Sequence, residues 1–366
     1  MGSEDRVQNE PYADRCRRLT AALHGLGLGG LLVTSPVNVR YLSGFTGSNG
    51  AVLVSGDGVT VATDGRYVEQ AERETGLAPL VTRGLLRALV GRAIQKGVDV
   101  LGVERDVVTI ADFEVISEAA GALRLSPRSG LVEAQRVRKD ATELAALRRA
   151  AAIADAAFAA MLDDLRPGVS EHEVAVALEE SMRRHGAQAP AFATHVAAGP
   201  NGSEPHHRPT DYVIAAGDLV TVDMGALVDG YHSDMTRTVA VGSPSGWQRE
   251  LYGVVEAAQR AGIAAVTVGA PAAAVDAAAR AVIDEAGYGD RFPHGVGHGV
   301  GLQIHEAPML FGAGDVTLAE CMVVTVEPGI YLPGRGGVRI EDTVVVGSGE
   351  VLTRASYDPI LTSPGR

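Results

Sequence analysis

Two acidic residues in the C-terminal half of the chain lie in stretches that otherwise have the composition of core strands. Asp223 is part of the apolar, β-branched run 219–224, and Asp234 is part of the Thr- and Val-rich run 231–241. The pattern predicts two strands joined by a short polar turn at 229–230, where Asp is followed by Gly. Burying a carboxylate in such a strand is costly unless something pairs with it. A lone Asp usually lies at a strand end in water, but two further acids of the same kind favour a shared site.

Glu327 and Glu341 occur in the same sequence context. Glu327 closes the apolar run 322–327 and is followed by Pro-Gly, which ends the strand there. Glu341 lies inside a predicted strand, 337–346. Between the two pairs of acids lies the segment 294–305, in which many glycines leave the backbone open to close approach and three histidines supply imidazoles. Four strand-borne carboxylates and a histidine-rich segment together indicate a metal site.

Electrostatics predict which kind of metal site this is. If the four carboxylates converge, their charges repel one another and raise the pKa of each carboxyl group. Two divalent cations would offset that charge. Ligation mainly by oxygen, with one imidazole, favours Mn²⁺, with Co²⁺ or Zn²⁺ as alternatives. Two such ions about 3.5–4 Å apart can share a bridging hydroxide as nucleophile and polarise a carbonyl group, which is the chemistry of a hydrolase.

The motifs around these residues resemble those of the pita-bread metallopeptidases, and within them the proline-specific members, Xaa-Pro aminopeptidase and Xaa-Pro dipeptidase (prolidase). The resemblance rests on VDMGA around Asp223, SDMTRT around Asp234, HGVGHGVGLQIHE around His298, VEPGIY around Glu327 and RIEDT around Glu341. It implies that Asp223 binds one metal ion through both oxygens. It further implies that Asp234 and Glu341 bridge two ions, and that His298 and Glu327 complete the second site.

The same resemblance implies catalytic roles beyond metal binding. It assigns a substrate-facing, catalytic histidine to His206, in the polar loop 199–209. It assigns substrate binding or proton shuttling to His294, and substrate binding near the scissile bond to His305. Glu327 is expected to shuttle a proton toward the prolyl nitrogen. Three other histidines are expected to have no catalytic role: His195, His207 and His232.

Residue spacing predicts which of these side chains face the same way. His294 and His298 differ by an even number, so both point to one side of an extended segment, and the interleaved glycines make a helix unfavourable. Arg339 lies two residues before Glu341 and faces the same side of the predicted strand. It is either a surface residue of an edge strand or a partner that holds a ligand carboxylate. Because the family carries a functional Arg at this position, we favour the second role.

The elements that position these residues divide into two predicted domains after a disordered tail, residues 1–11. Residues 12–133 alternate helix and strand signals and indicate an α/β domain, similar to the N-terminal domain of creatinase. Residues 134–366 are expected to form an α+β domain of the pita-bread (creatinase/aminopeptidase-like) type, in which an internal duplication packs helices on a curved antiparallel sheet. The predicted helices of this second domain, of which the first opens with the capping box Asp140-Ala-Thr-Glu143, are 140–161, 170–185, 250–267 and 272–286.

Composition limits the partners and the location of the protein. The 366 residues carry a net charge of −13 without a visible basic face, which argues against nucleic acid as a partner. Cys16 and Cys321 are too few for a disulfide framework, and no segment is apolar enough to span a bilayer. The polar N-terminus has no apolar signal core. We therefore expect a cytoplasmic protein, and the resemblance implies a homodimer.

The predicted activity is hydrolysis of the Xaa-Pro bond at the N-terminus of short peptides by a metal-bridging hydroxide. Residues 38–50 and 63–67 resemble the N-terminal domain of Xaa-Pro aminopeptidases more closely than that of typical prolidases. Xaa-Pro aminopeptidase is therefore the main hypothesis, and Xaa-Pro dipeptidase is the alternative. A catalytically inactive peptide-binding module and a non-metal enzyme such as creatinase share the fold, but the retained ligands argue against both. Methionine aminopeptidase shares the ligands, but the separate N-terminal domain argues against it.

Overall fold

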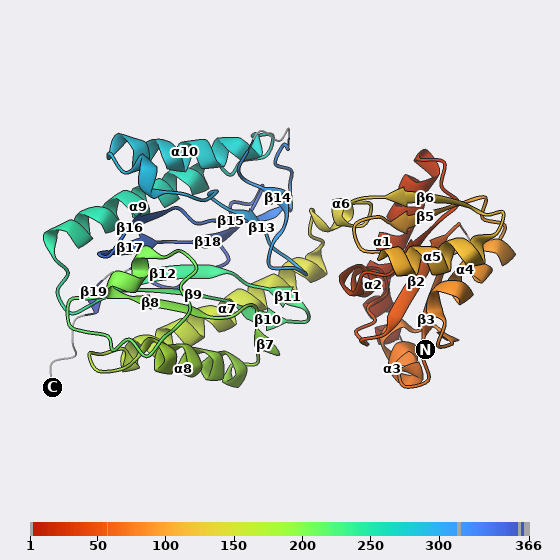
Figure 1. The fold of residues 1–366 in the computed structure, drawn as a ribbon, viewed down its shortest axis with the longest axis horizontal. Coiled ribbons are helices and arrows are strands. Elements are labelled where there is room, and N and C mark those ends of the chain that lie inside the picture. The colour runs from red at the N-terminus through yellow and green to blue at the C-terminus, as the bar shows by residue number, and fades with distance from the viewer. Residues whose placement is uncertain (1–2, 57, 313–315, 358–359, 362–366) are drawn as a thin grey trace. The chain divides into compact units, whose positions relative to one another are not determined.

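The computed structural model describes residues 3–56, 58–312, 316–357 and 360–361, and the chain divides into two compact units (Figure 1). The N-terminal unit spans Met1–Arg136 and the C-terminal unit spans Val137–Arg366. This division lies close to the boundary that we predicted after residue 133.

The N-terminal unit is built around a mixed sheet with the strand order β4-β3-β2-β1-β5-β6. Strand β2 pairs antiparallel with β1 and β3, whereas β5 runs parallel to β1 and β6. The strands are β1 (Gly30–Val33), β2 (Gly50–Ser55), β3 (Gly58–Thr63), β4 (Leu80–Val81), β5 (Val100–Glu104) and β6 (Arg124–Arg128). The helices are α1 (Ser3–Gly25), α2 (Pro36–Ser43), α3 (Val68–Thr75), α4 (Leu85–Gln95), α5 (Ile110–Ala120) and α6 (Glu133–Arg136).

The core of the N-terminal unit lies between this sheet and its helices. Leu32, Leu53 and Leu101 are fully buried and share one apolar cluster with Leu89 of α4. These contacts explain the α/β architecture predicted from the sequence, because the apolar face of the sheet is buried against helices.

Two parts of the N-terminal unit differ from expectation. Helix α1 begins at Ser3, so a helix occupies most of the segment expected to be a disordered tail, while Met1 and Gly2 lie outside the described residues. Helix α2 covers residues 38–43 of the segment 38–50, whose glycines at 44, 47 and 50, taken alone, indicate only a loop. The glycine signal there reflects the end of α2, where Gly44 adopts the left-handed conformation with φ 78°.

The C-terminal unit contains two pairs of helices. They are α7 (Ala141–Asp164) with α8 (Glu171–Arg184), and α9 (Gly246–Ala265) with α10 (Ala272–Glu285). The capping box predicted for α7 is confirmed, because the Asp140 carboxylate accepts from the amides of Thr142 and Glu143, and Glu143 accepts in return from the Asp140 amide. Short 3-10 helices η1 (Gly199–Ser203) and η2 (Gly289–Arg291) lie in connections.

Each helix pair covers one part of a strongly curved β structure (Figure 1). Helices α7 and α8 pack on the ladder β19-β12-β9-β8, and α9 and α10 pack on the ladder β14-β13-β15-β18. Smaller ladders, β11-β10-β7 and β16-β17, complete the structure. The duplicated arrangement of helices on a curved antiparallel sheet is confirmed.

The strands of the C-terminal unit are short and interrupted. They are β7 (Ala189–Pro190), β8 (His195–Ala198), β9 (Leu219–Met224), β10 (Ala226–Val228), β11 (Tyr231–His232), β12 (Met235–Val241), β13 (His298–Gly299), β14 (Glu306–Met309), β15 (Val323–Val326), β16 (Gly329–Leu332), β17 (Gly336–Arg339), β18 (Asp342–Val345) and β19 (Ile360–Leu361). The two larger ladders meet where the Glu341 amide donates to the Thr236 carbonyl at 3.1 Å.

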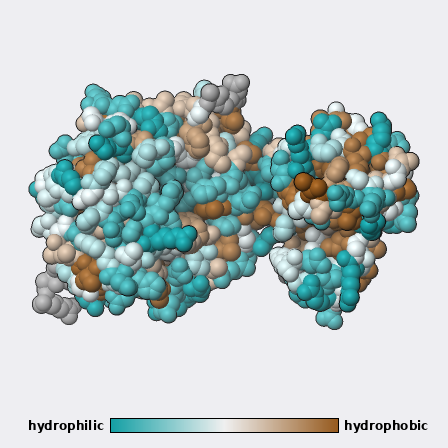
Figure 2. All heavy atoms as spheres, viewed as in Figure 1, coloured by the Kyte–Doolittle hydropathy of each residue, from teal (hydrophilic) through white to brown (hydrophobic). Residues whose placement is uncertain are grey.

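The surface of the C-terminal unit is mainly hydrophilic on the face shown in Figure 2, in keeping with a net charge of −13. Across the described ranges, no helix combines the length and the apolar character that crossing a membrane requires.

Candidate metal centre and active site

Adjacent antiparallel strands position Asp223 and Asp234. Strand β9 carries Asp223, whose register partner is Thr236 of β12, and Asp234 directly precedes β12. The turn predicted at 229–230 is confirmed, since Asp229 and Gly230 join β10 to β11 and both have positive φ, 49° and 75°. The chain therefore leaves and re-enters the sheet so that both carboxylates face one cavity.

Glu327 and Glu341 lie where strands end. Glu327 directly follows β15, as the Pro-Gly signal predicted. Our expectation that Glu341 lies inside a strand is wrong, because residue 341 falls in the break between β17 and β18. The backbone groups that leave the ladder there are satisfied by β12: the Glu341 amide donates to Thr236, and its carbonyl accepts from the Arg237 guanidinium.

The glycine-rich segment 294–305 forms no helix, as predicted, but only His298 and Gly299 form a strand, β13, and bends occupy several of the other positions. A Cβ on Gly297 would lie 2.1 Å from the Thr325 carbonyl oxygen, so only glycine allows this close approach. The His298 Nδ1–H donates to the Gly299 carbonyl at 3.0 Å, because a carbonyl oxygen can only accept. That bond leaves Nε2 free to face the carboxylates, which is the arrangement expected of a metal-binding histidine.

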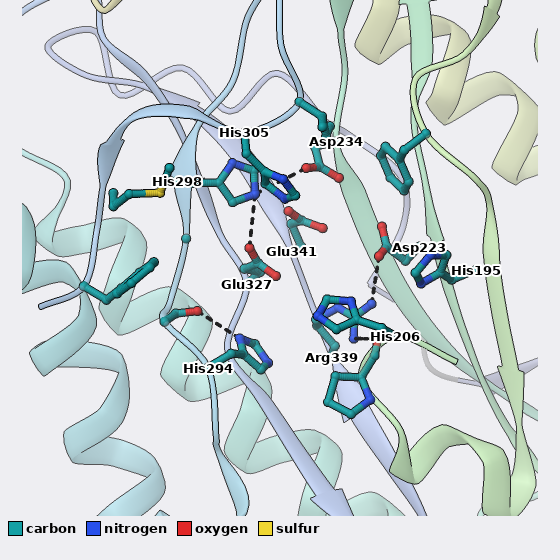
Figure 3. A pocket seen from close by; sticks show the side chains of 17 residues that line it. His195, His206, Asp223, Asp234, His294, His298, His305, Glu327, Arg339 and Glu341 are labelled. Atoms are coloured by element: carbon teal, nitrogen blue, oxygen red, sulfur yellow. Dashed lines mark hydrogen bonds and ion pairs between the residues drawn. The ribbon is translucent and has the colours of Figure 1, made fainter. Parts of the chain in front are cut away.

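One pocket of about 450 Å³ brings together all the residues for which the sequence predicted a role (Figure 3). They are His206, Asp223, Asp234, His294, His298, His305, Glu327, Arg339 and Glu341. In Figure 3 the side chains of Asp234, Glu341 and Glu327 point toward His298, and Asp223 faces the same space from the opposite side.

The donor atoms of this pocket fit a divalent cation. One ligand atom each from Asp234, His298 and Glu341 lies within 4.8 Å of the others. His298 Nε2 lies 3.6 Å from Asp234 Oδ2 and 3.4 Å from Glu327 Oε1. Asp223 Oδ1 is buried and has no hydrogen-bond partner among the described residues. A buried carboxylate oxygen without a partner is costly, so this atom is suited to bind a cation.

Two carboxyl groups of the cluster, those of Asp234 and Glu341, have raised pKa values. Burial, followed by the neighbouring carboxylates, raises the pKa of Asp234 and of Glu341 well above the usual range. Burial alone would also raise the pKa of Glu327 and lower that of His298. The hydrogen bond and charge between these two residues outweigh burial, so the Glu327 pKa is lowered and the His298 pKa is raised.

Arg339 binds a carboxylate of the pocket, which is the role that we favoured for it, and its partner is Asp223. Its Nη2 lies 2.9 Å from Asp223 Oδ2, and the guanidinium also donates to the Tyr331 hydroxyl at 3.0 Å. The contact with the Tyr331 hydroxyl and the charges of Asp223 and Glu327 outweigh burial and raise the Arg339 pKa. The arginine therefore stays charged in the pocket and holds Asp223 Oδ2, the oxygen opposite the unpartnered Oδ1.

Sequence reasoning missed functional contacts of His195 and Tyr331. His195 lies on β8 directly opposite Asp223 and lines the pocket, and its Nδ1 is buried without a partner among the described residues. The Tyr331 hydroxyl lies 2.8 Å from His294 Nε2, and His294 Nδ1 lies 2.9 Å from the Gly295 carbonyl. This pair of bonds fixes the His294 tautomer, with the proton on Nδ1. Only the VEPGIY motif, which ends at Tyr331, carried a signal for either residue.

The remaining histidines differ in whether they lie at the pocket. The ring centroids of His305 and His298 lie 4.4 Å apart, so His305 borders the cluster of carboxylates. His207 and His232 do not line the pocket.

Removing divalent ions should make the stability of the protein strongly dependent on pH. Asp234, Glu341 and His298 have raised pKa values in the folded protein. Each group therefore favours folding most at pH values below its pKa in the unfolded chain, and it loses that contribution as the pH rises through its pKa in the folded protein. We expect the melting temperature of chelator-stripped protein to fall from about pH 5 to about pH 8. The metal-loaded protein should lack this fall, so the difference between the two should grow with pH. Thermal scans of both forms in matched buffers measure it.

The Asp234→Asn variant is the control for this titration. It removes one charge from the cluster with little change of shape, so stripped Asp234→Asn should show a shallower fall than stripped wild type. A stripped wild-type protein with a constant melting temperature between pH 5 and pH 8 would contradict the repulsion that we infer.

Comparison with known proteins gives two family matches. Residues 145–348 match metallopeptidase family M24, and residues 15–138 match the Creatinase/Prolidase N-terminal domain. The chain is 37% identical over 334 residues to the Xaa-Pro dipeptidase of Pyrococcus furiosus, with 91% of this chain and 95% of the relative covered.

Solved structures share the fold over nearly the whole chain. The Xaa-Pro dipeptidase from Bacillus anthracis superposes with a TM-score of 0.92 at 42% identity, covering 96% of this chain and 100% of that one. The X-Pro aminopeptidase from Thermotoga maritima superposes with a TM-score of 0.89 at 34% identity, covering 95% and 100%. The carboxylate and histidine cluster thus lies in a fold and a sequence context shared with known peptidases, and the chain belongs to metallopeptidase family M24.

Proposed function

We propose that the protein is a metal-dependent Xaa-Pro dipeptidase that uses two divalent ions, with Mn²⁺ favoured over Co²⁺ and Zn²⁺. The observation that carries the proposal is the convergence of four carboxylates and one imidazole on a single pocket, with Asp223 Oδ1 buried and without a partner among the described residues. Oxygen-rich ligation of this kind suits Mn²⁺. The homodimer and the cytoplasmic location stay predictions.

We prefer the Xaa-Pro dipeptidase, whereas the sequence alone favoured the Xaa-Pro aminopeptidase. The aminopeptidase hypothesis depended on segments around Asn38 and Asp64. Asn38 donates to the buried carboxylate of Glu104, and Asp64 pairs with Arg66, so both motifs are accounted for by the structure of the N-terminal unit itself. These contacts of Asn38 and Asp64 are structural and do not favour either activity. Two of the three relatives named above are Xaa-Pro dipeptidases, and the third is an X-Pro aminopeptidase.

The five ligand residues would divide between the two ions. Asp223 would hold one ion, Asp234 and Glu341 would serve both ions, and His298 and Glu327 would hold the other. When bound, the ions would polarise the scissile carbonyl and lower the pKa of water. Arg339 holds Asp223 in place, with its Nη2 2.9 Å from Asp223 Oδ2.

The residues around the ligands supply the rest of the chemistry. The nitrogen of an Xaa-Pro bond belongs to a tertiary amide without an N–H, so it must gain a proton as the carbon–nitrogen bond breaks. Glu327 would take a proton from the attacking water and pass it to the prolyl nitrogen. His206 and His305 line the pocket and would stabilise negative charge on the carbonyl oxygen.

A comparison of substrates tests this proposal. Chelator-stripped protein reloaded with Mn²⁺ should hydrolyse an Xaa-Pro dipeptide with a higher kcat/KM than an Xaa-Pro-Yaa tripeptide, because a dipeptidase must recognise the free carboxylate next to the scissile bond. An Xaa-Ala dipeptide is the control for proline specificity. Equal or faster cleavage of the tripeptide would favour the aminopeptidase. Absence of metal-dependent cleavage of either peptide would favour an inactive peptide-binding module.

A further inference from the structure

The loop that brings His206 to the pocket, residues 199–210, holds that histidine through its backbone. The His206 side chain is exposed, and its recorded ring contact is an edge-on approach to His195, with ring centroids 6.2 Å apart. The His206 ring makes no hydrogen bond to any other described residue. The position of the imidazole over the pocket therefore depends on what fixes the loop on either side of it.

One side of the loop is fixed by strand β17. The Arg339 guanidinium donates to the Pro205 carbonyl at 3.1 Å, directly before His206. Gly202 packs against the same strand so closely that a Cβ on Gly337 would lie 2.3 Å from the Gly202 carbonyl oxygen. The arginine that holds Asp223 thus also holds the loop.

The other side of the loop is fixed by Glu171, the first residue of α8, whose side chain is fully buried. Its Oε1 accepts from the Ala198 amide at 2.7 Å and from the Asn201 amide group at 3.0 Å. Its Oε2 accepts from the Thr210 amide at 3.0 Å and hydroxyl at 2.6 Å, and lies 2.9 Å from His207 Nε2. One carboxylate therefore binds the first part, the middle and the end of the loop.

These hydrogen bonds keep the buried carboxylate ionised. Burial would raise the Glu171 pKa, but bonds from Thr210, Ala198, Asn201 and His207 outweigh burial and lower it. An ionised acceptor strengthens each of the bonds that it receives. Because Glu171 is charged and can only accept, His207 Nε2–H is the donor in the contact between them.

His207 is the member of this network that lies next to the substrate-facing residue. Its side chain is 10% exposed and points to Glu171, with Nδ1 3.8 Å from the carboxylate of Glu204, while the neighbouring His206 lines the pocket. We propose that Glu171 and His207 form an anchor pair that positions His206 for the reaction. This inference rests on the proposed function, and it gives His207 a positioning role where the sequence predicted none.

A double-mutant cycle on the metal-loaded enzyme tests the pair. If His207 acts through His206, His207→Ala should lower kcat for an Xaa-Pro substrate by about tenfold or more with little change in KM, because a displaced catalytic group weakens the transition state and not substrate binding. His207→Gln keeps a donor for Glu171 and should recover part of the loss. In a His206→Ala background, His207→Ala should have no further effect. The matched control is His172→Ala, since His172 is exposed and lies next to Glu171.

Hydrogen exchange of the backbone amides of residues 199–210 gives a second readout that needs no activity. His207→Ala should accelerate exchange in this loop relative to wild type, and His172→Ala should not. If wild-type protein cleaves no Xaa-Pro peptide, the proposed function fails, and the exchange measurement alone decides whether the anchor exists. Unchanged exchange in His207→Ala, an unchanged kcat, or losses that simply multiply in the double variant would each overturn the anchor pair.

Discussion

The Asp234→Ala variant should lose nearly all hydrolytic activity together with its metal. Asp234 Oδ2 lies 3.6 Å from His298 Nε2. One ligand atom each from Asp234, His298 and Glu341 lies within 4.8 Å of the other two. Because we propose that Asp234 serves both ions, its removal should weaken metal binding at both sites. Metal ions contribute several kcal/mol of transition-state stabilisation, and a loss of about 4 kcal/mol corresponds to roughly a thousandfold in rate. The measurements are kcat for an Xaa-Pro dipeptide and elemental analysis of the purified protein.

A thermal scan separates loss of metal from loss of fold in this variant. Stripped wild type carries the repulsion between Asp234 and its neighbours, so stripped Asp234→Ala should melt at a temperature no lower than stripped wild type at neutral pH. Asp163→Ala is the control, since Asp163 is exposed on α7 and should keep both activity and metal. Retained turnover with a full metal content would refute the bridging role of Asp234.

Local sequence signals were sufficient to predict which carboxylates meet in the site, and the family resemblance supplied the assignments of the individual histidines. Asp223 and Glu327 interrupt apolar runs at positions where the chain must turn, and the glycines around His298 exclude a helix. The capping box at Asp140 likewise marks the start of α7 to the residue. Such signals are local, so they can be read without knowing which strands pair.

What the sequence could not predict depends on strand register and on contacts between distant segments. His195 faces Asp223 because β8 and β9 pair with these residues opposite each other, and no local pattern encodes that register. Arg339 has the spacing of a partner for Glu341, but in the folded protein its guanidinium binds Asp223 of the distant strand β9. In the sequence, Glu171 is an ordinary residue at the start of a predicted helix. Only the folded structure shows that its buried carboxylate binds the loop 199–210.

Substitution of Glu327 by Gln should separate proton transfer from metal binding. The Glu327→Gln change keeps the shape of the side chain and one oxygen that can face a cation, but it removes the group that can carry a proton. General acid–base catalysis contributes about 10²- to 10⁴-fold, so kcat should fall by that factor while KM changes little. The assay needs saturating Mn²⁺, because the lost charge also weakens the hold on a cation, and metal content must be measured on the same samples. Glu320→Gln, at an exposed position seven residues earlier, is the matched control.

The pH dependence of kcat/KM shows whether the loss in Glu327→Gln arises from proton transfer. The His298 contact at 3.4 Å keeps the Glu327 pKa low, so in wild type the carboxylate is ready to accept a proton throughout the neutral range. Wild-type activity should fall on the acidic side as Glu327 becomes protonated, and Glu327→Gln should lose this acidic limb along with its rate. If the variant keeps full turnover with metal bound, another group moves the proton. His294, whose Nδ1 proton is held by the Gly295 carbonyl and whose Nε2 meets the Tyr331 hydroxyl, is then the next residue to replace.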